Sequence, residues 1–269
     1  MLRRAATYMV VGCFIAAFTA APASAQPSDL VRRAEAGNMQ AQNNLGLAYH
    51  SGDGVKQNFT LAFQWYERAA EQGLAIAQHN LALMYDGGAG VNADARMAAH
   101  WYRRAANQGL SIAQNNLGVM YDEGTGVDRD QAEAAIWYRQ AAEQGLALAQ
   151  YNLGMAFHYG RGVVRDAGEA VRWYRAAAQQ DLPGAQQILG MMYDLGRGVP
   201  TDEAQAMYWY QRAAEHGDAV AQYILGMRYH TGEGVPADPA SARKWIVKAA
   251  AQGLEQARTL KSELESEIR

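Results

Sequence analysis

The chain has 269 residues, of which 49% are hydrophobic and 19% charged, and its formal net charge at pH 7 is −3. This composition is too apolar for a disordered chain, and 6 prolines are too few for a collagen-like one. No block of lysine and arginine provides the basic face that nucleic-acid binding requires, so nucleic acid is excluded as the expected partner.

The first 25 residues predict a signal peptide. Leu2-Arg3-Arg4 is a short positive start, residues 5–21 are apolar and uncharged, and Pro22-Ala23-Ser24-Ala25 offers the small residues that a signal peptidase reads. The apolar run is at the short limit for a membrane span, so we favour cleavage after Ala25 over an anchor. We expect an exported, periplasmic protein whose mature form does not span the membrane; secretion and a lipid anchor are the alternatives.

Cys13 is the only cysteine, and the residues around it only loosely resemble a bacterial lipobox. Because it lies inside the signal peptide, the mature protein has no cysteine. Disulfide bonds, a thiol nucleophile and a thiolate metal site are therefore excluded after cleavage.

A period of 36 residues governs the rest of the chain. Glycines, valines, and pairs of alanine and glutamine recur at this interval without an insertion, as do all 6 tryptophans. The tryptophans are Trp65, Trp101, Trp137, Trp173, Trp209 and Trp245.

The repeated unit reads A-Q-x-N-L-G-x-x-Y-x-x-G-x-G-V-x-x-D-x-x-x-A-x-x-W-Y-x-x-A-A-x-x-G. It resembles the Sel-one-like repeat, a relative of the tetratricopeptide repeat, over residues 37–252. Departures from the motif are few, namely Ala82, Phe157, Asn58, Ile246 and Asp181.

Apolar residues within each unit follow helical spacing twice. Ala41, Leu45 and Tyr49 form the first stripe, and Ala62 and Trp65 belong to the second. Glycines separate the two stripes, an aspartate such as Asp94 stands where a helix N-cap is expected, and a glycine ends the second stripe. Glycine inside the first helix, as at Gly46, indicates a close approach of another helix.

Each unit is therefore a helical hairpin that buries its apolar faces only by stacking on neighbours. The predicted fold is all-α, a right-handed α-solenoid of six 36-residue hairpins with capping helices at residues 26–36 and 253–269. No domain boundary or linker is visible inside this array.

Catalytic and metal-binding patterns are weak. His50, His158 and His230 share a column with three aspartates, but no two histidines lie at helical ligand spacing, so no metal or cofactor is expected. Ser241 and Lys244 match the S-x-x-K motif of penicillin-recognising enzymes without its partner motifs. The G-x-G-V turns lack the features of a phosphate loop. No catalytic residue is assigned.

The resemblance implies that the first helix of each hairpin lines a concave groove. Reading down the inward columns, an asparagine ladder gives way to apolar and aromatic residues, which mark interaction sites more often than inert surface. The amides either pair with the backbone of a bound peptide or bond within the protein. The predicted partner-binding residues are Asn44, Asn80, Asn116, Asn152, Tyr151, Met155, Tyr159, Ile188, Met191, Leu195, Tyr223, Ile224 and Met227.

These observations predict an exported, non-enzymatic scaffold or regulator that binds a protein or extended peptide in the groove. Relatives imply an envelope sensor or an assembly protein as partner. The alternative is a cell-envelope hydrolase or penicillin-recognising enzyme on the same repeats. A third interpretation is a structural spacer.

Overall fold

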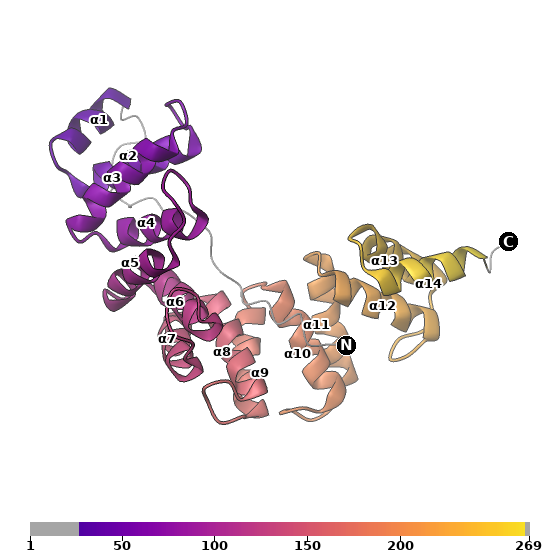
Figure 1. Ribbon diagram of the computed structural model, residues 1–269. Coiled ribbons are helices and arrows are strands. Elements are labelled where there is room, and N and C mark those ends of the chain that lie inside the picture. The colour runs from indigo at the N-terminus through magenta and orange to yellow at the C-terminus, as the bar shows by residue number, and fades with distance from the viewer. Residues whose placement is uncertain (1–26, 267–269) are drawn as a thin grey trace. The chain divides into compact units, whose positions relative to one another are not determined.

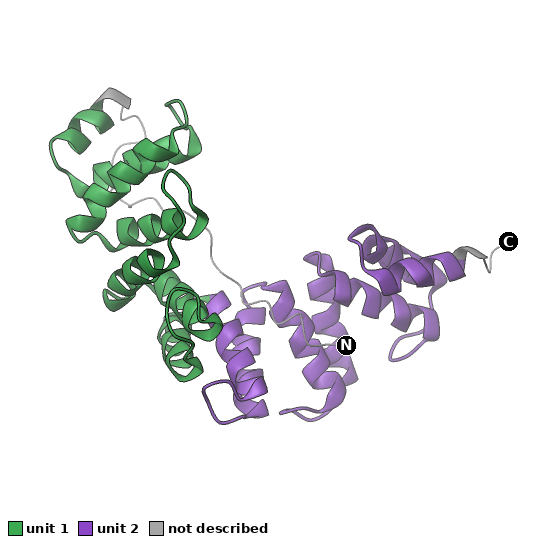
Figure 2. Ribbon diagram, viewed as in Figure 1, with its two compact units in different colours: residues 1–146 green, residues 147–269 purple. Residues whose placement is uncertain are grey.

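A computed structural model describes residues 27–266, and all 14 elements in this range are helices. The chain divides into two compact units, described separately below (Figure 2). The predicted signal peptide lies outside the described residues.

The first unit, residues 27–146, contains one helix followed by three hairpins (Figure 1). Each helix packs against the next along the chain, so the hairpins α2/α3, α4/α5 and α6/α7 stack in sequence order. The helices are α1 (Pro27–Glu35), α2 (Met39–Ser51), α3 (Phe59–Glu71), α4 (Ala75–Gly87), α5 (Ala95–Asn107), α6 (Ser111–Glu123) and α7 (Gln131–Glu143).

The second unit, residues 147–266, contains three hairpins followed by one helix. The all-α prediction of stacked hairpins is confirmed in both units. The helices are α8 (Ala147–Tyr159), α9 (Ala167–Ala178), α10 (Pro183–Leu195), α11 (Glu203–Glu215), α12 (Ala219–Thr231), α13 (Pro239–Ala251) and α14 (Glu255–Ser266).

Helix ends follow the chemistry that the repeat predicts. The side chain of Asp130 accepts hydrogen bonds from the backbone N–H groups of Ala132 and Glu133, which otherwise have no partner at a helix start. At the other end, Gly73 adopts φ 97° and lets the N–H of Leu74 bond to the carbonyl of Ala69. The aspartate N-caps of the second helices are Asp94, Asp130, Asp166, Asp202 and Asp238.

The glycine inside the first helix marks a close approach, as expected. A Cβ atom at Gly118 would lie 2.7 Å from the ring of Tyr138 on the second helix of the same hairpin. Tyr138 is one of five equivalent tyrosines that are fully buried. Glycine therefore lets the two helices of a hairpin enclose an aromatic ring.

A column of buried glutamines joins successive hairpins. Gln78 donates from Nε2 to the carbonyl of Ala70 at the end of the preceding hairpin, 3.1 Å away. Its Oε1 accepts from Gln108, which follows the second helix of its own hairpin, at 2.7 Å. Gln42 and Gln114 make the same two bonds in the first unit, and Gln222 makes them in the second. Sequence reasoning missed this role, although the invariant spacing of the Ala-Gln pairs signalled it.

Candidate functional site

The apolar part of the predicted groove lies on the first helices of the second unit, α8, α10 and α12. Tyr159 and Leu195, each the last residue of its helix, are 54% and 52% exposed. Burial raises the pKa of the Tyr151 hydroxyl, and the nearby Tyr159 and Asp218 raise it further. The half-buried members are Tyr151, Ile188, Met191, Tyr223, Ile224 and Met227.

Several of these residues also serve the core of the unit. Met191 and Ile224 pack against the buried cluster that includes Tyr210 and Trp245. Tyr223 packs against the buried alanines of α13 and α14. Met155 is buried, so its assignment to the groove surface is corrected. The surface available to a partner therefore includes fewer residues than the sequence predicted. Its most exposed residues lie at the ends of the helices.

The asparagine ladder does not reach the surface. Asn80 and Asn116 of the first unit are buried, and so is Asn152 of the second; only Asn44 is partly exposed. Asn80 donates from Nδ2 to Oδ1 of Asn43 at 2.9 Å. Because a buried amide needs partners inside the protein, the prediction that these three side chains contact a ligand is corrected in favour of internal bonding.

The predicted column of histidine and aspartate is divided among separate contacts. In the first unit, Asp122 accepts a hydrogen bond from Gln131 at 2.7 Å, while burial raises the pKa of Asp86. In the second unit, burial lowers the pKa of His158, and the positive charges of Arg165 and Arg197 lower it further. Within residues 27–266, no group of three or more His, Cys, Asp or Glu side chains is placed to hold a metal ion.

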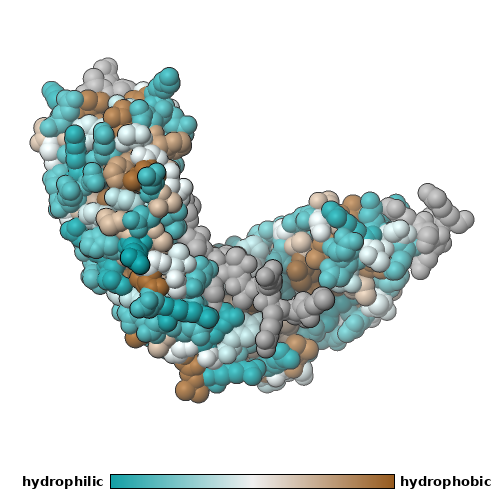
Figure 3. Space-filling model, viewed as in Figure 1, coloured by the Kyte–Doolittle hydropathy of each residue, from teal (hydrophilic) through white to brown (hydrophobic). Residues whose placement is uncertain are grey.

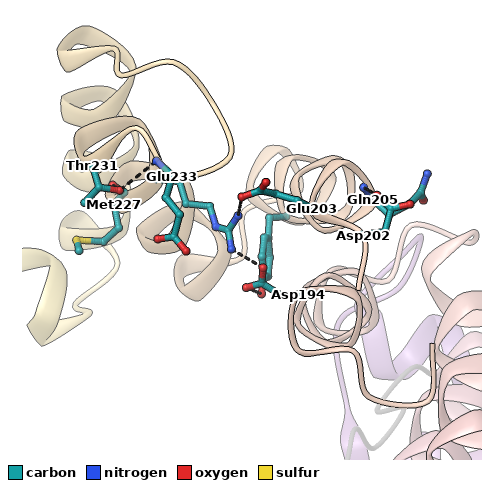
Figure 4. A network of polar contacts seen from close by, with 9 residues as sticks. Asp194, Asp202, Glu203, Gln205, Met227, Thr231 and Glu233 are labelled. Atoms are coloured by element: carbon teal, nitrogen blue, oxygen red, sulfur yellow. Dashed lines mark hydrogen bonds and ion pairs between the residues drawn. The ribbon is translucent and has the colours of Figure 1, made fainter. Parts of the chain in front are cut away.

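Asp194 of this column, itself half-buried, forms an ion pair with a buried arginine. The guanidinium of Arg228, on α12, is 2.5 Å from the Asp194 carboxylate on α10 and 3.8 Å from Glu203 on α11 (Figure 4). The hydroxyl of Tyr210 also donates to Asp194. Arg228 is 7% exposed, so the pair links two successive hairpins inside the unit rather than presenting a charge to a ligand.

The Ser241 and Lys244 pair shows no sign of a catalytic arrangement. Ser241 lies in the first turn of α13, where its backbone N–H bonds to the N-cap Asp238. The Lys244 ammonium lies 5.0 Å from the ring centroid of Trp245, in a cation–π contact. The lysine is therefore engaged by the tryptophan.

Hydrophobic patches interrupt a largely hydrophilic surface on the face shown in Figure 3. No helix in the described part of the chain is long and apolar enough to cross a membrane. Apolar patches mark contact sites for other molecules where they are large and contiguous, whereas single exposed apolar side chains are ordinary on a protein surface.

Comparison with known proteins identifies the repeat. The Sel1 repeat family model matches six consecutive segments that together run from residue 40 to residue 254. These segments begin a few residues later than the expected boundaries. They cover residues 40–74, 75–110, 111–146, 147–182, 183–218 and 219–254.

Solved structures show the same fold. The c5321 protein, a protective antigen present in uropathogenic Escherichia coli strains and displaying an SLR fold, is 39% identical over 90% of this chain, with a TM-score of 0.86. The chain spans about half of that protein's length (52%). A Sel1 repeat protein from Oxalobacter formigenes is 36% identical, with a TM-score of 0.74, covering 83% of this chain and 87% of its own.

A more distant structure is similar in fold alone. The immunity protein PA5088 from Pseudomonas aeruginosa is 20% identical, with a TM-score of 0.52, covering 79% of this chain and 80% of its own. No curated protein matches the chain. The comparisons therefore establish architecture more closely than activity.

Proposed function

Because the chain belongs to the Sel1 repeat family, whose repeats generally mediate protein–protein interaction, we propose that it is an exported, non-enzymatic binding protein. In this proposal a protein or extended peptide binds the first-helix face of the second unit, formed by α8, α10 and α12. Its role is that of a scaffold or a regulator in the cell envelope.

The observation that carries the proposal is that apolar and aromatic side chains occupy this face of the second unit, where the first unit has asparagines. Tyr159 and Leu195 are more than half exposed, and half-buried Met191 and Met227 lie on the neighbouring helices. Methionine adapts to different partner shapes, and tyrosine offers a large contact area with a polar end. Since the fold does not require apolar side chains at exposed helix ends, binding is the better explanation for them.

Export is supported by residues 1–25. A positive start, an apolar run and small residues before the expected cleavage point make a signal peptide. The E. coli relative is described as a protective antigen, which also fits an exported protein. We place the mature chain in the periplasm.

Export is tested by recovering the protein from a periplasmic fraction and sequencing its N-terminus. We expect the mature chain to begin at Gln26. A control variant carrying Ala23→Leu and Ala25→Leu should remain uncleaved, because a signal peptidase requires small residues at these positions. Recovery of the intact N-terminus only from the cytoplasm would contradict export.

Partner binding is tested by placing a photo-crosslinking amino acid at Met191 or Met227 in living cells. We expect both positions to capture the same protein. Tyr208, 48% exposed on the second helix α11, is the matched control and should not capture it. Equal capture at Tyr208, or different proteins at the two methionines, would contradict binding on the first-helix face.

A further inference from the structure

At two positions of the repeat, the fourth and fifth hairpins carry residues of a different kind from those in the other hairpins. At the last residue of the first helix, Tyr159 and Leu195 replace the small or polar residues Ser51, Gly87, Glu123 and Thr231. Immediately after the helix-ending glycine, the fourth and fifth hairpins carry arginine. This second column reads Asp53, Ala89, Thr125, Arg161, Arg197 and Glu233.

The loop that carries Arg197 passes close to the backbone at the start of α9, the helix that follows the loop of Arg161 and Arg165. A Cβ atom at Gly198, in the α10–α11 loop, would lie 2.2 Å from the carbonyl oxygen of Ala167, at the start of α9. This contact places Arg197 beside the end of the α8–α9 loop, where Arg165 stands. Both arginines are exposed. Two adjacent loops of one unit therefore present their guanidinium groups at the same edge.

An aromatic ring lies within this cluster of charge. The guanidinium of Arg161 is 4.9 Å from the ring centroid of Tyr159, and the ring of Tyr159 stacks on that of His158 with centroids 4.7 Å apart. Burial lowers the pKa of His158 most, and the charges of Arg165 and Arg197 lower it further. Val164, between the arginines of the α8–α9 loop, is 89% exposed.

Nearby carboxylates are already engaged by other groups. Asp194 pairs with Arg228, and Asp166 accepts hydrogen bonds from two backbone N–H groups at the start of α9. Asp202 caps α11 in the same way. Of these carboxylates only Asp194 is paired with a cation; the three arginines outnumber Asp166 and Asp202, so the edge has a positive local charge on a chain whose net charge is negative.

We propose that this arginine edge, consisting of Arg161, Arg165 and Arg197 with Tyr159 and Leu195, binds an acidic protein segment through its carboxylates and one apolar side chain. Guanidinium groups bind carboxylates in a bidentate manner, and the exposed ring and leucine provide the apolar contact. The inference rests on the proposed function, since Tyr159 and Leu195 belong to both, and it adds the chemistry of the partner.

An acidic segment fits this edge better than a nucleic acid does. A nucleic acid needs a basic face that extends along several phosphates, whereas these three arginines lie in two loops. The turns of the other hairpins lack this excess of arginine, because Asp53 is accompanied by Lys56, Asp128 is accompanied by Arg129, and the sixth turn carries Glu233. A short acidic stretch matches the small extent of the charge, and complementary charge gives such a contact its selectivity.

The test uses fluorescence anisotropy with the full chain and a short fluorescein-labelled peptide of glutamate, tyrosine and leucine. The test variant carries Arg161→Thr, Arg165→Ala and Arg197→Thr, residues that other repeats use in these loops. We expect it to bind at least about tenfold more weakly, which corresponds to about 1.4 kcal/mol. The control variant carries Arg32→Ala, Arg96→Ala and Arg243→Ala, which removes the same charge elsewhere and should bind like wild type.

Two further probes define the partner. Replacing tyrosine and leucine in the peptide by glycine should weaken binding, and replacing glutamate by lysine should abolish it. An equal loss in both triple variants, no binding of the acidic peptide, or tighter binding of a single-stranded oligonucleotide or of phosphatidylglycerol vesicles would overturn the inference.

The outcome is separable from the test of the proposed function. If the peptide fails to bind while Met191 and Met227 still capture a common protein, only the arginine edge is wrong. If the peptide binds the edge while the methionines capture nothing in common, binding on the wider helix face is wrong.

Discussion

The two units use the same repeat frame but fill their first helices differently. In the first unit, Asn80 and Asn116 are buried, and Asn80 bonds to Asn43 of the preceding hairpin. In the second unit, Ile188 and Ile224 stand at the equivalent positions, and the ion pair of buried Arg228 with Asp194 joins two hairpins. The frame thus tolerates either polar or apolar links between first helices, provided that each buried polar group has a partner.

The buried residues of the second helices, in contrast, barely differ between the units. The tryptophans from Trp101 to Trp245 are at most 9% exposed, and five of the second helices carry a fully buried tyrosine, which lies against a first-helix glycine in four of them. The second helices therefore vary at their exposed positions, whereas the first helices also differ between the units at buried ones. Substitutions in the shared frame should therefore cost the most stability, and changes to the charges that distinguish the units the least.

Trp137→Ala should cause the largest loss. Trp137 is buried, and its Nε1 donates to Glu133 at 2.9 Å. Removing a buried indole should lower the free energy of unfolding by about 3–5 kcal/mol, measured by urea denaturation. Ile136→Ala, at an exposed position on the same helix, is the control and should cost much less. A loss below about 1 kcal/mol for Trp137→Ala would contradict its role in the frame.

Arg228→Ala should destabilise the second unit by about 2–3 kcal/mol, because it leaves Asp194 without its cation in a half-buried site. Replacing both partners, with Arg228→Met and Asp194→Asn, should cost less than Arg228→Ala alone, since methionine stands at this position in three other repeats. Urea denaturation of the single and double variants measures the coupling. Strictly additive losses would show that the pair contributes nothing.

Asn80→Ala should cost about 1–3 kcal/mol, because Asn43 then keeps a buried amide oxygen without its donor. The equivalent change in the second unit, Ile224→Ala, removes apolar contact but leaves no polar group unpaired. In the Asn80→Ala protein, a second change of Asn43→Ala should therefore cost less than it does alone. If each change costs the same in either background, the two amides are not coupled.

The smallest effect should be a difference between His50 and His158 in how much each makes stability depend on pH. Burial alone lowers the pKa of His50 in the first unit, whereas burial and two arginines lower that of His158 in the second. The unfolded chain binds a proton near the ordinary pKa of 6.5 and the folded chain does so only at lower pH. Stability is therefore fully present above this value and falls as the pH drops below it.

His158→Asn should flatten this fall more than His50→Asn does, because more groups oppose protonation at His158. Urea midpoints between pH 7.5 and 5.5 provide the measurement. If stability falls more steeply with pH in the His158→Asn variant than in the His50→Asn variant, His158 is not the histidine whose protonation is opposed more strongly.

The sequence was sufficient to predict the hairpins, because their ends depend on local chemistry. Aspartate before a helix and glycine after it act within a few residues. Asp181, which replaces the closing glycine of its repeat, adopts φ 61° as a glycine would. A repeat of fixed length then places each hairpin relative to the next. The division at residue 146 has no counterpart in the spacing, since the period continues through it unchanged.

The candidate site was less predictable, because exposure depends on neighbouring hairpins. The change of the asparagine ladder from amides to apolar residues is visible in the sequence itself, but whether Asn80 faces a ligand or Asn43 depends on contacts 37 residues apart. The arginine edge was missed because its members come from two loops. The 36-residue spacing of Arg161 and Arg197 was the available signal, and the close approach of Gly198 to Ala167 adds Arg165 to them.

The glutamine column has a consequence for how this kind of protein changes its length over evolutionary time. Each buried glutamine satisfies a carbonyl of the hairpin before it and a side chain of its own hairpin, with the same bonds at successive joints. A gene duplication or deletion of one whole period therefore recreates an identical joint, with every buried donor and acceptor again supplied. An insertion of another size between this carbonyl and the glutamine eight residues later would separate the two groups, so selection should favour gain and loss of complete repeats at this joint.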